Sequence, residues 1–286
     1  MPGRFINLIQ MVLRCEMFSI LILTYNEEKN LAECLDSISW CNDIWVLDSG
    51  STDRTVEIAK ERGCHLLARK FDNFGDQRNY AIDTATFKYP WVFDLDADER
   101  FTDALKAECE EMVRKDEKSA YYCSYKNIMW GKWLKHSTNF PVYQMRFHKL
   151  GEIRFEPFGH GQKEGPAERG IGYLKESYVH YNFSKGLKDW FAKHVEYGYR
   201  EALLRIEEDA NPLSFKGKDK ISRRRRLKRL SYRVPFRPLF KFLYTYFWRL
   251  GFLDGFAGLQ FSLMQVWAIF MYDSIYKDMK RQGCDS

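Results

Sequence analysis

Short apolar runs alternate with polar turns and amphipathic stretches through the first hundred residues. The apolar runs predict four strands, at residues 18–23, 43–48, 64–68 and 91–95. The segments between them predict three helices: one at residues 29–38, one that follows the turn at residues 49–53 and ends at Arg62, and one at residues 73–87. Because strand alternates with helix, we expect an α/β fold: a mostly parallel sheet with helices on both faces.

After residue 119 the pattern changes to longer strands, at residues 121–129 and 142–149, separated by glycine-rich turns. This part is expected to be mixed or antiparallel. A helix at residues 186–208 and aromatic, apolar helices at 235–276 follow. The chain is therefore divided into an extension, two halves of an α/β core and a helical tail, at residues 1–16, 17–130, 131–209 and 210–286.

Polar clusters follow three of the predicted strands, at residues 24–28, 48–53 and 94–99. In parallel sheets, ligands bind beyond the carboxyl ends of the strands. The three clusters fall at that edge, so we expect them to form one site.

The most informative run is Trp91-Val-Phe-Asp-Leu-Asp-Ala-Asp-Glu99. Strand alternation places Asp94, Asp96 and Asp98 on one face, while Phe93 and Leu95 enter the core. Hard divalent cations such as Mg²⁺ bind carboxylate oxygens, commonly one or two of them together with a substrate's phosphates. A solvated acidic strand edge is the alternative for this run taken alone.

The net charge of +6 hides an asymmetry, because residues 216–241 hold twelve Lys or Arg and one Asp. That segment carries +11, which leaves −5 for the remainder. Such a segment suits an anionic partner, and no nucleic-acid-binding module accompanies it, so an anionic membrane surface is favoured over nucleic acid. The seven cysteines are scattered without a C-x-x-C pair, which is typical of a reducing compartment and not of a disulfide framework or zinc site.

The apolar stretch at residues 255–272 only reaches the lower length limit for a membrane-spanning helix, and glycine and polar residues dilute it. An interfacial helix at the membrane surface is the favoured interpretation, with Trp248 and Trp267 at headgroup level. There are two alternatives: a buried helix that completes the core, and a basic face exposed to solvent.

Five motifs in order resemble the family 2 inverting glycosyltransferases with the GT-A fold, most closely the branch of lipopolysaccharide-core glucosyltransferases. They are Leu23-Thr-Tyr-Asn-Glu-Glu-Lys-Asn-Leu31, Val46-Leu-Asp-Ser-Gly-Ser-Thr-Asp-Arg-Thr55, Phe74-Gly-Asp-Gln-Arg-Asn79, Asp94-Leu-Asp-Ala-Asp-Glu99 and, more loosely, Gly251-Phe-Leu-Asp-Gly255. The resemblance implies that residues 17–130 bind a nucleotide sugar, 131–209 bind the acceptor, and 210–286 form a basic linker and membrane-associated helices.

The resemblance also implies site residues. Thr24, Tyr25, Asn26, Glu27, Asp48, Gln77, Arg78 and Asp96 would line the nucleotide site, with Arg78 facing the diphosphate. Mg²⁺ or Mn²⁺ would bind Asp96 and Asp98, and His180 could reach the metal or diphosphate. Asp94 would position the loop. A surface role for Arg78 and a structural role for His180 are the alternatives.

An inverting transfer to a hydroxyl needs a general base. Related enzymes carry Val-His-Glu in this region, whereas this chain reads Phe158-Gly-His-Gly-Gln-Lys-Glu-Gly165. Glu164 is the first candidate, followed by His160 and then Glu156, on a glycine-bounded loop or an ordinary polar turn.

These features predict a metal-dependent glycosyltransferase that uses a UDP-sugar to extend a glycolipid, such as lipopolysaccharide core, at the inner face of the cytoplasmic membrane. The membrane contact would involve residues 216–276. Alternatives are a polyprenyl-phosphate glycosyltransferase, whose anionic acceptor needs no base, and a catalytically degenerate GT-A domain that serves as a membrane-bound assembly protein or nucleotide-sensing protein. A nucleotidyltransferase is disfavoured because residues 24–28 contain no glycine.

Overall fold

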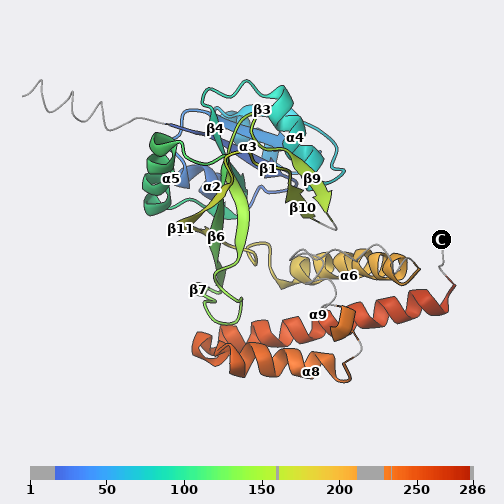
Figure 1. Ribbon diagram of the computed structural model, residues 1–286. Coiled ribbons are helices and arrows are strands. Elements are labelled where there is room, and N and C mark those ends of the chain that lie inside the picture. The colour runs from blue at the N-terminus through green and yellow to red at the C-terminus, as the bar shows by residue number, and fades with distance from the viewer. Residues whose placement is uncertain (1–16, 159–160, 211–228, 233, 284–286) are drawn as a thin grey trace, which may run out of the picture. The chain divides into compact units, whose positions relative to one another are not determined.

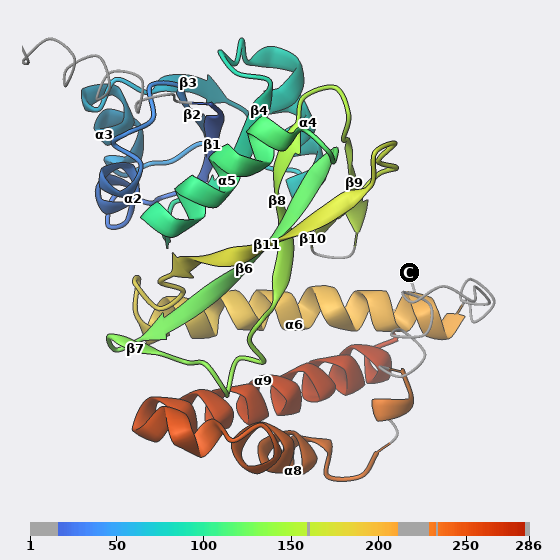
Figure 2. The ribbon, with the colours of Figure 1, turned by 60° about the vertical axis from the view of Figure 1, so that its left-hand side comes forward.

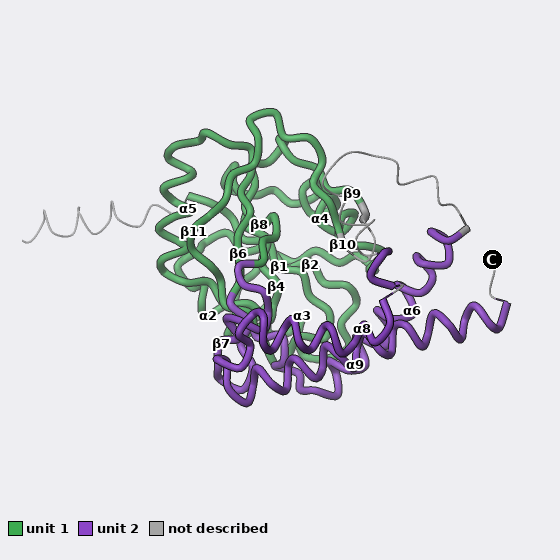
Figure 3. The backbone as a smooth tube through the Cα atoms, turned by 60° about the horizontal axis from the view of Figure 1, so that its bottom comes forward, with its two compact units in different colours: residues 1–125, 142–180 green, residues 126–141, 181–286 purple. Residues whose placement is uncertain are grey.

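The structure is a computed structural model that describes residues 17–158, 161–210, 229–232 and 234–283. The predicted extension at 1–16 lies outside these ranges, as do His160 and most of the basic run. Two compact units are present (Figure 3): unit 1 holds residues 1–125 and 142–180, and unit 2 holds residues 126–141 and 181–286.

Unit 1 is an α/β unit whose elements follow the predicted alternation at its start (Figure 1). Its strands are β1 (Ser19–Thr24), β2 (Ile44–Asp48), β3 (His65–Ala68), β4 (Trp91–Asp96), β5 (Glu99–Arg100), β6 (Ala120–Met129), β8 (Tyr143–Lys149), β9 (Phe155–Phe158), β10 (Gly161–Glu164) and β11 (Ile171–His180). Its helices are α2 (Leu31–Ser37), α3 (Thr55–Glu61), α4 (Phe74–Thr84) and α5 (Asp103–Lys115). The far end of β6 belongs to unit 2, where β7 (Lys132–Trp133) pairs with it.

The main sheet has the strand order β3-β2-β1-β4-β8-β6-β11-β5. The β3, β2, β1 and β4 strands are parallel, and β8 joins β4 antiparallel. The predicted change from parallel to antiparallel pairing is therefore confirmed, and so is the α/β class.

Alternate residues of β1 enter different cores, which shows that both faces of the sheet are covered. Ile20 and Ile22 pack with residues of α2, α3 and α5, whereas Leu21 packs with Ala81 of α4. These β1 residues are fully buried. Burying a branched aliphatic side chain contributes about 1.5–3 kcal/mol, so the apolar runs fix both the strands and their covering helices.

Unit 2 consists of a β-hairpin end and a helical layer. Its helices are α6 (Leu187–Ala210), α8 (Arg237–Phe242), the π-helical segment η2 (Leu243–Trp248), the 3₁₀ turn η3 (Gly251–Asp254) and α9 (Gly255–Arg281). In Figure 2, α9 lies between α6 and α8. Trp190 of α6 and Phe261 and Met264 of α9 share a buried core with Met129. None of the helices within the described residues combines the length and apolar character needed to cross a bilayer.

The Gly251-Phe-Leu-Asp-Gly255 motif has a structural role in unit 2. Asp254 is 2% exposed and accepts hydrogen bonds from the backbone N–H groups of His136 and Ser137, at 3.0 and 2.8 Å, and from the Ser137 hydroxyl at 2.7 Å. A Cβ atom on Gly251 would lie 2.6 Å from the carbonyl oxygen of Thr245. Asp254 therefore holds the loop after β7 against η3, and the glycine permits the close backbone packing.

Candidate functional site

The three predicted polar clusters lie at one edge of the sheet. In the strand register, Thr24 at the end of β1 is opposite Asp48 at the end of β2, and Leu23 is opposite Asp96 at the end of β4. Because β1, β2 and β4 are adjacent and parallel, their carboxyl ends open on the same side. The predicted common edge is confirmed.

The first two turns are tied together by hydrogen bonds. Asp48 is 5% exposed and accepts from the backbone N–H groups of Gly50 and Ser51 at 2.9 and 2.8 Å, and from the Thr24 hydroxyl at 3.0 Å. The side-chain oxygen of Asn26 accepts from the N–H of Thr52 at 2.8 Å. Asn26 has a φ of 53°, a left-handed conformation that asparagine tolerates better than most residues.

The remaining residues of the first turn differ in exposure. Glu27 donates its backbone N–H to the Thr55 hydroxyl at 2.7 Å, and its carboxylate accepts from the Asn30 amide at 2.7 Å. The Tyr25 side chain is 58% exposed. Thr24, Asn26, Glu27 and Asp48 thus form a rigid double turn, beside which Tyr25 presents an aromatic ring to solvent.

The three aspartates of the acidic run occupy different environments. Asp94 is 1% exposed and accepts from Arg78 Nε at 3.0 Å. Asp96 lies at the mouth of the site, with a side chain 36% exposed, 2.7 Å from Arg146 Nη2 and 3.7 Å from Arg78 Nη2. Asp98 lies in the turn after β4, 3.3 Å from His180 Nε2. The set-back position of Asp94 agrees with a supporting role.

Positive neighbours keep the two inner aspartates ionised. Burial opposes ionisation of Asp94, but the Arg78 guanidinium, together with His148, outweighs it and lowers the pKa of Asp94. Burial likewise opposes ionisation of Asp96, yet Arg146 and Arg78 hold the pKa of Asp96 far below its usual range. Two carboxylates therefore remain charged at neutral pH in a largely buried setting.

Arg146 and Glu99 form a buried pair that the sequence did not single out. Arg146 Nη2 donates to Glu99 Oε1 at 2.6 Å, and the two side chains are 3% and 1% exposed. Burial raises the pKa of Glu99 to about 8, although Arg146 lowers it in part. Glu99 also accepts from the backbone N–H of Asp96 at 2.8 Å. Arg146 and Glu99 thus fix the backbone and carboxylate of Asp96.

His180 reaches the acidic turn because β11 ends beside β5, with His180 paired to Glu99 in register. Burial alone would lower the pKa of His180, but Asp98 reverses this effect and raises it. The structure therefore brings the predicted metal residues Asp98 and His180 together. Among the described residues, no group of three or more His, Cys, Asp or Glu side chains is arranged to hold a metal ion.

The Gln77-Arg78-Asn79 triplet of α4 connects three parts of unit 1. The Gln77 amide donates to the carbonyl oxygen of Lys70 at 3.0 Å, which fixes the loop before α4. Besides its bond to Asp94, Arg78 donates to the Gln162 side chain at 2.6 Å. Asn79 exchanges hydrogen bonds with the backbone of Phe155, at 2.7 and 3.0 Å. Arg78 is 5% exposed, so the surface-arginine alternative is wrong.

Glu164 lies on a strand rather than on the expected loop. β10 pairs antiparallel with β9, and Glu164 is opposite Phe155. Its carboxylate accepts a hydrogen bond from the Tyr122 hydroxyl. Gln162 and Glu164 are two residues apart on this strand, so they share a face, and Gln162 contacts Arg78. Glu156 is on β9 and exposed, while His160 lies outside the described residues.

Comparison with known proteins identifies the family of this sequence. The Glycosyl transferase family 2 profile matches residues 19–165, which is 147 of the 286 residues. This range includes the double turn, the acidic run, the α4 triplet and Glu164.

Individual relatives match shorter parts. The lipopolysaccharide core biosynthesis glycosyltransferase LpsC of Rhizobium meliloti is 31% identical over 100 residues, covering 33% of this chain and 36% of that protein. The SPbeta prophage-derived glycosyltransferase SunS of Bacillus subtilis is 36% identical over 97 residues, covering 32% of this chain and 22% of that protein. The chain thus spans about a third of the LpsC length. The crystal structure of S. aureus TarS 1–349 aligns over 93% of this chain and 92% of that chain, with 15% identity and a TM-score of 0.42.

Proposed function

Since the chain belongs to glycosyl transferase family 2, we propose that it is an inverting glycosyltransferase that takes a sugar from a nucleotide sugar, foremost a UDP-sugar. The observation that carries this proposal is the common edge of β1, β2 and β4, where a rigid polar double turn lies next to the ionised Asp96. Such an edge supplies hydrogen-bonding groups for a nucleoside beside an acidic group for a diphosphate-bound cation.

We propose that the carboxylates of Asp96 and Asp98 hold a divalent cation that is shared with the donor's diphosphate. Asp96 and Asp98 provide two carboxylates, His180 lies next to Asp98, and the partial exposure of Asp96 leaves one side open. Mg²⁺ typically takes one or two protein carboxylates and completes its coordination with phosphate and water. A bound Mg²⁺ or Mn²⁺ would stabilise the charge that develops on the leaving nucleoside diphosphate. Arg78, Arg146 and Glu99 would hold Asp96 in place.

For the acceptor we propose a hydroxyl of a lipid-linked or cell-surface glycan, with lipopolysaccharide core as the first candidate. The match to LpsC, whose name states a role in core biosynthesis, supports this acceptor class. The proposed enzyme would work at the inner face of the cytoplasmic membrane, where its basic residues could contact anionic lipids.

Glu164 is the proposed base that removes the proton of the acceptor hydroxyl. Its strand neighbour Gln162 contacts Arg78, and Arg78 contacts the acidic edge. Two strand residues span roughly 7 Å, which brings Glu164 close to this network. Glu164 accepts from the Tyr122 hydroxyl, which would orient its carboxylate.

We expect Glu164→Gln to lower turnover roughly a hundredfold, because removal of a general base costs about that factor or more. The glutamine oxygen can still accept from Tyr122, so donor binding should be unchanged. Steady-state kinetics and calorimetric titration with UDP measure the two quantities. Glu168→Gln, at an exposed glutamate in the turn before β11, is the matched control and should keep full turnover. Normal turnover of the Glu164 variant would assign the base to another residue.

A donor panel tests the proposed function as a whole. Purified protein is mixed with UDP-, GDP- and dTDP-sugars, with and without Mn²⁺ and a membrane lipid extract, and nucleotide release is measured. Mn²⁺-dependent release from a UDP-sugar that increases with lipid extract is expected. Mass spectrometry of the product distinguishes a glycosylated glycan from a sugar-linked polyprenyl phosphate. Absence of release from every donor would contradict the proposal.

A further inference from the structure

One surface of unit 2 is both aromatic and positively charged. Its members come from the β7 hairpin, the end of η2 and the start of α9, and we call it the aromatic–basic face: Trp130, Lys132, Lys135, Trp248, Arg249 and Phe256. Trp248 is 80% exposed and Phe256 is 70% exposed. Trp130 stacks on Phe256, with their ring centroids 5.9 Å apart. Large exposed apolar patches on a protein often mark a binding surface.

The exposed apolar residues continue along the helix before this face. Phe236, Leu239, Phe240, Leu243, Tyr244 and Phe247 are all exposed and recur at helical spacing through α8 and η2. They form a stripe along an outer helix of unit 2 that α9 does not cover. An apolar stripe next to cationic residues is the pattern of a helix that lies in the plane of a membrane interface.

The charges of the aromatic–basic face have one sign. Residues 126–141 contain no Asp or Glu, and residues 235–272 contain only Asp254, whose oxygens already accept from the His136–Ser137 loop. Within the part of the chain that the structure describes, no carboxylate forms an ion pair with Lys132, Lys135 or Arg249. Arg237 differs, because it pairs with Asp273 at 3.0 Å. The face therefore lacks counter-charges of its own.

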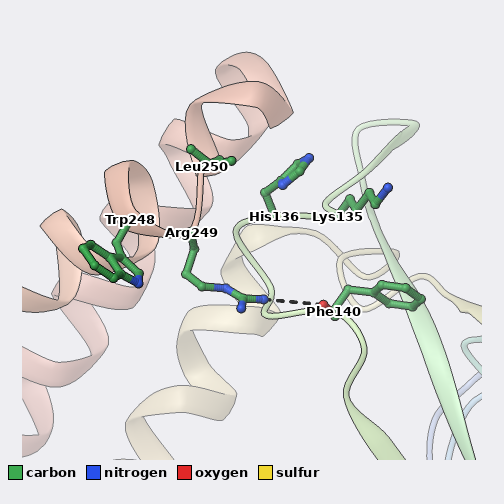
Figure 4. A pocket seen from close by; sticks show the side chains of 6 residues that line it. All are labelled: Lys135, His136, Phe140, Trp248, Arg249 and Leu250. Atoms are coloured by element: carbon green, nitrogen blue, oxygen red, sulfur yellow. Dashed lines mark hydrogen bonds between the residues drawn. The ribbon is translucent and has the colours of Figure 1, made fainter.

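A pocket of about 290 Å³ opens at this face (Figure 4). Lys135, His136 and Phe140 line one side, and Trp248, Arg249 and Leu250 line the other. Arg249 Nη2 donates a long hydrogen bond of 3.4 Å to the Phe140 carbonyl oxygen. Its Nε is buried and has no hydrogen-bond partner among the described residues. Because Arg249 and Lys135 both line the pocket, an anionic oxygen there would meet the two cationic side chains together.

We propose that the aromatic–basic face docks on an anionic lipid bilayer and that its Lys135–Arg249 pocket binds the phosphate of a lipid headgroup. This inference rests on the proposed function, because docking on a membrane would bring the enzyme to a lipid-linked acceptor. Tryptophan and phenylalanine enter the interfacial region, while the cations meet the lipid phosphates. A second copy of the chain is a poorer occupant, because two such faces would bring like charges together without an acid between them.

Vesicle flotation tests this docking with the full chain. Vesicles of phosphatidylcholine alone are compared with vesicles that also contain phosphatidylglycerol. Wild-type protein should bind only the second kind, and the binding should weaken as salt is added. Lys135→Glu reverses one charge and should weaken the binding roughly tenfold. Trp248→Ser removes an exposed interfacial ring and should weaken it by a similar factor, roughly tenfold.

Matched controls come from α6. Lys193→Glu and Tyr199→Ser change an exposed lysine and an exposed tyrosine of the same unit and should bind vesicles like the wild type. UDP binding of every variant is measured in a separate titration. A protein that binds vesicles but not UDP would support the docking surface and contradict the proposed function. Equal binding to both kinds of vesicle would overturn the inference, as would unchanged binding of the two face variants. A dimer in light scattering that Trp248→Ser dissociates, with no vesicle binding, would assign the face to a second copy.

Discussion

Asp98→Asn is expected to reduce sugar transfer roughly a thousandfold while the protein stays folded. The amide keeps the size of the carboxylate but removes the charge that a diphosphate-bound cation requires. In the free protein the carboxylate lies 3.3 Å from His180, at the partly exposed end of the acidic run. The substitution therefore affects the proposed cation site and leaves the buried core of unit 1 unchanged.

The measurement is nucleotide release at saturating donor, with a thermal unfolding curve for each protein. Asp83→Asn is the control, because Asp83 is an exposed aspartate of α4 whose partner is Arg154 at 2.6 Å. It should keep full activity. Wild-type turnover by the Asp98 variant, or indifference of the wild type to a chelator, would remove the proposed metal role.

Arg146→Met is expected to destabilise unit 1 by about 3–5 kcal/mol, which is the usual cost of leaving a buried charge without its partner. Arg146 contacts both Glu99 and Asp96, at 2.6 and 2.7 Å, and is 3% exposed on its side chain. Methionine fills much of the same space but supplies no charge. Denaturant unfolding, followed by tryptophan fluorescence, measures this change in the free energy of unfolding.

Two further variants identify its cause. Asp96→Asn in the Arg146→Met background removes the ionised carboxylate that has lost its Arg146 partner and should recover part of the lost stability, as in a double-mutant cycle. Arg54→Met removes an arginine whose side chain is 63% exposed and should leave the unfolding midpoint unchanged. If Arg146→Met unfolds at the wild-type denaturant midpoint, the contacts of Arg146 with Glu99 and Asp96 do not stabilise the acidic edge.

The sequence allowed the parallel half of the sheet and its polar edge to be predicted, because both depend on local patterns. Short apolar runs locate β1, β2 and β4, and each strand is followed directly by its polar turn. The relation between Thr24, Asp48 and Asp96 then follows from parallel pairing alone.

Arg146 and Glu99 were not predictable in the same way. Arg146 lies between Met145 and Phe147 in a strand pattern, where a charged residue ordinarily faces solvent. Its burial depends on the antiparallel pairing of β8 with β4 and on a partner 47 residues away. Strand alternation does place Arg146 and His148 on one face of β8. The sequence pattern does not show which residues pack against that face.

The hairpin that carries Glu164 shows a second limit. Glycines at 159, 161 and 165 favour a loop, whereas Gly161–Glu164 form β10. The strand forms because β9 is fixed by Asn79 of α4, a tertiary contact. The helix α5 is a further element absent from the prediction, although Leu105, Cys109 and Met112 have helical spacing and Thr102 caps its start.

The most direct test of the central claim is calorimetric titration of UDP into wild-type and Asp98→Asn protein, each with and without Mn²⁺. The proposed cation site predicts tight UDP binding only by the wild type with Mn²⁺, and weak binding in the other three titrations. Equal UDP affinity in all four titrations would contradict it, and so would the absence of UDP binding by the wild type with Mn²⁺.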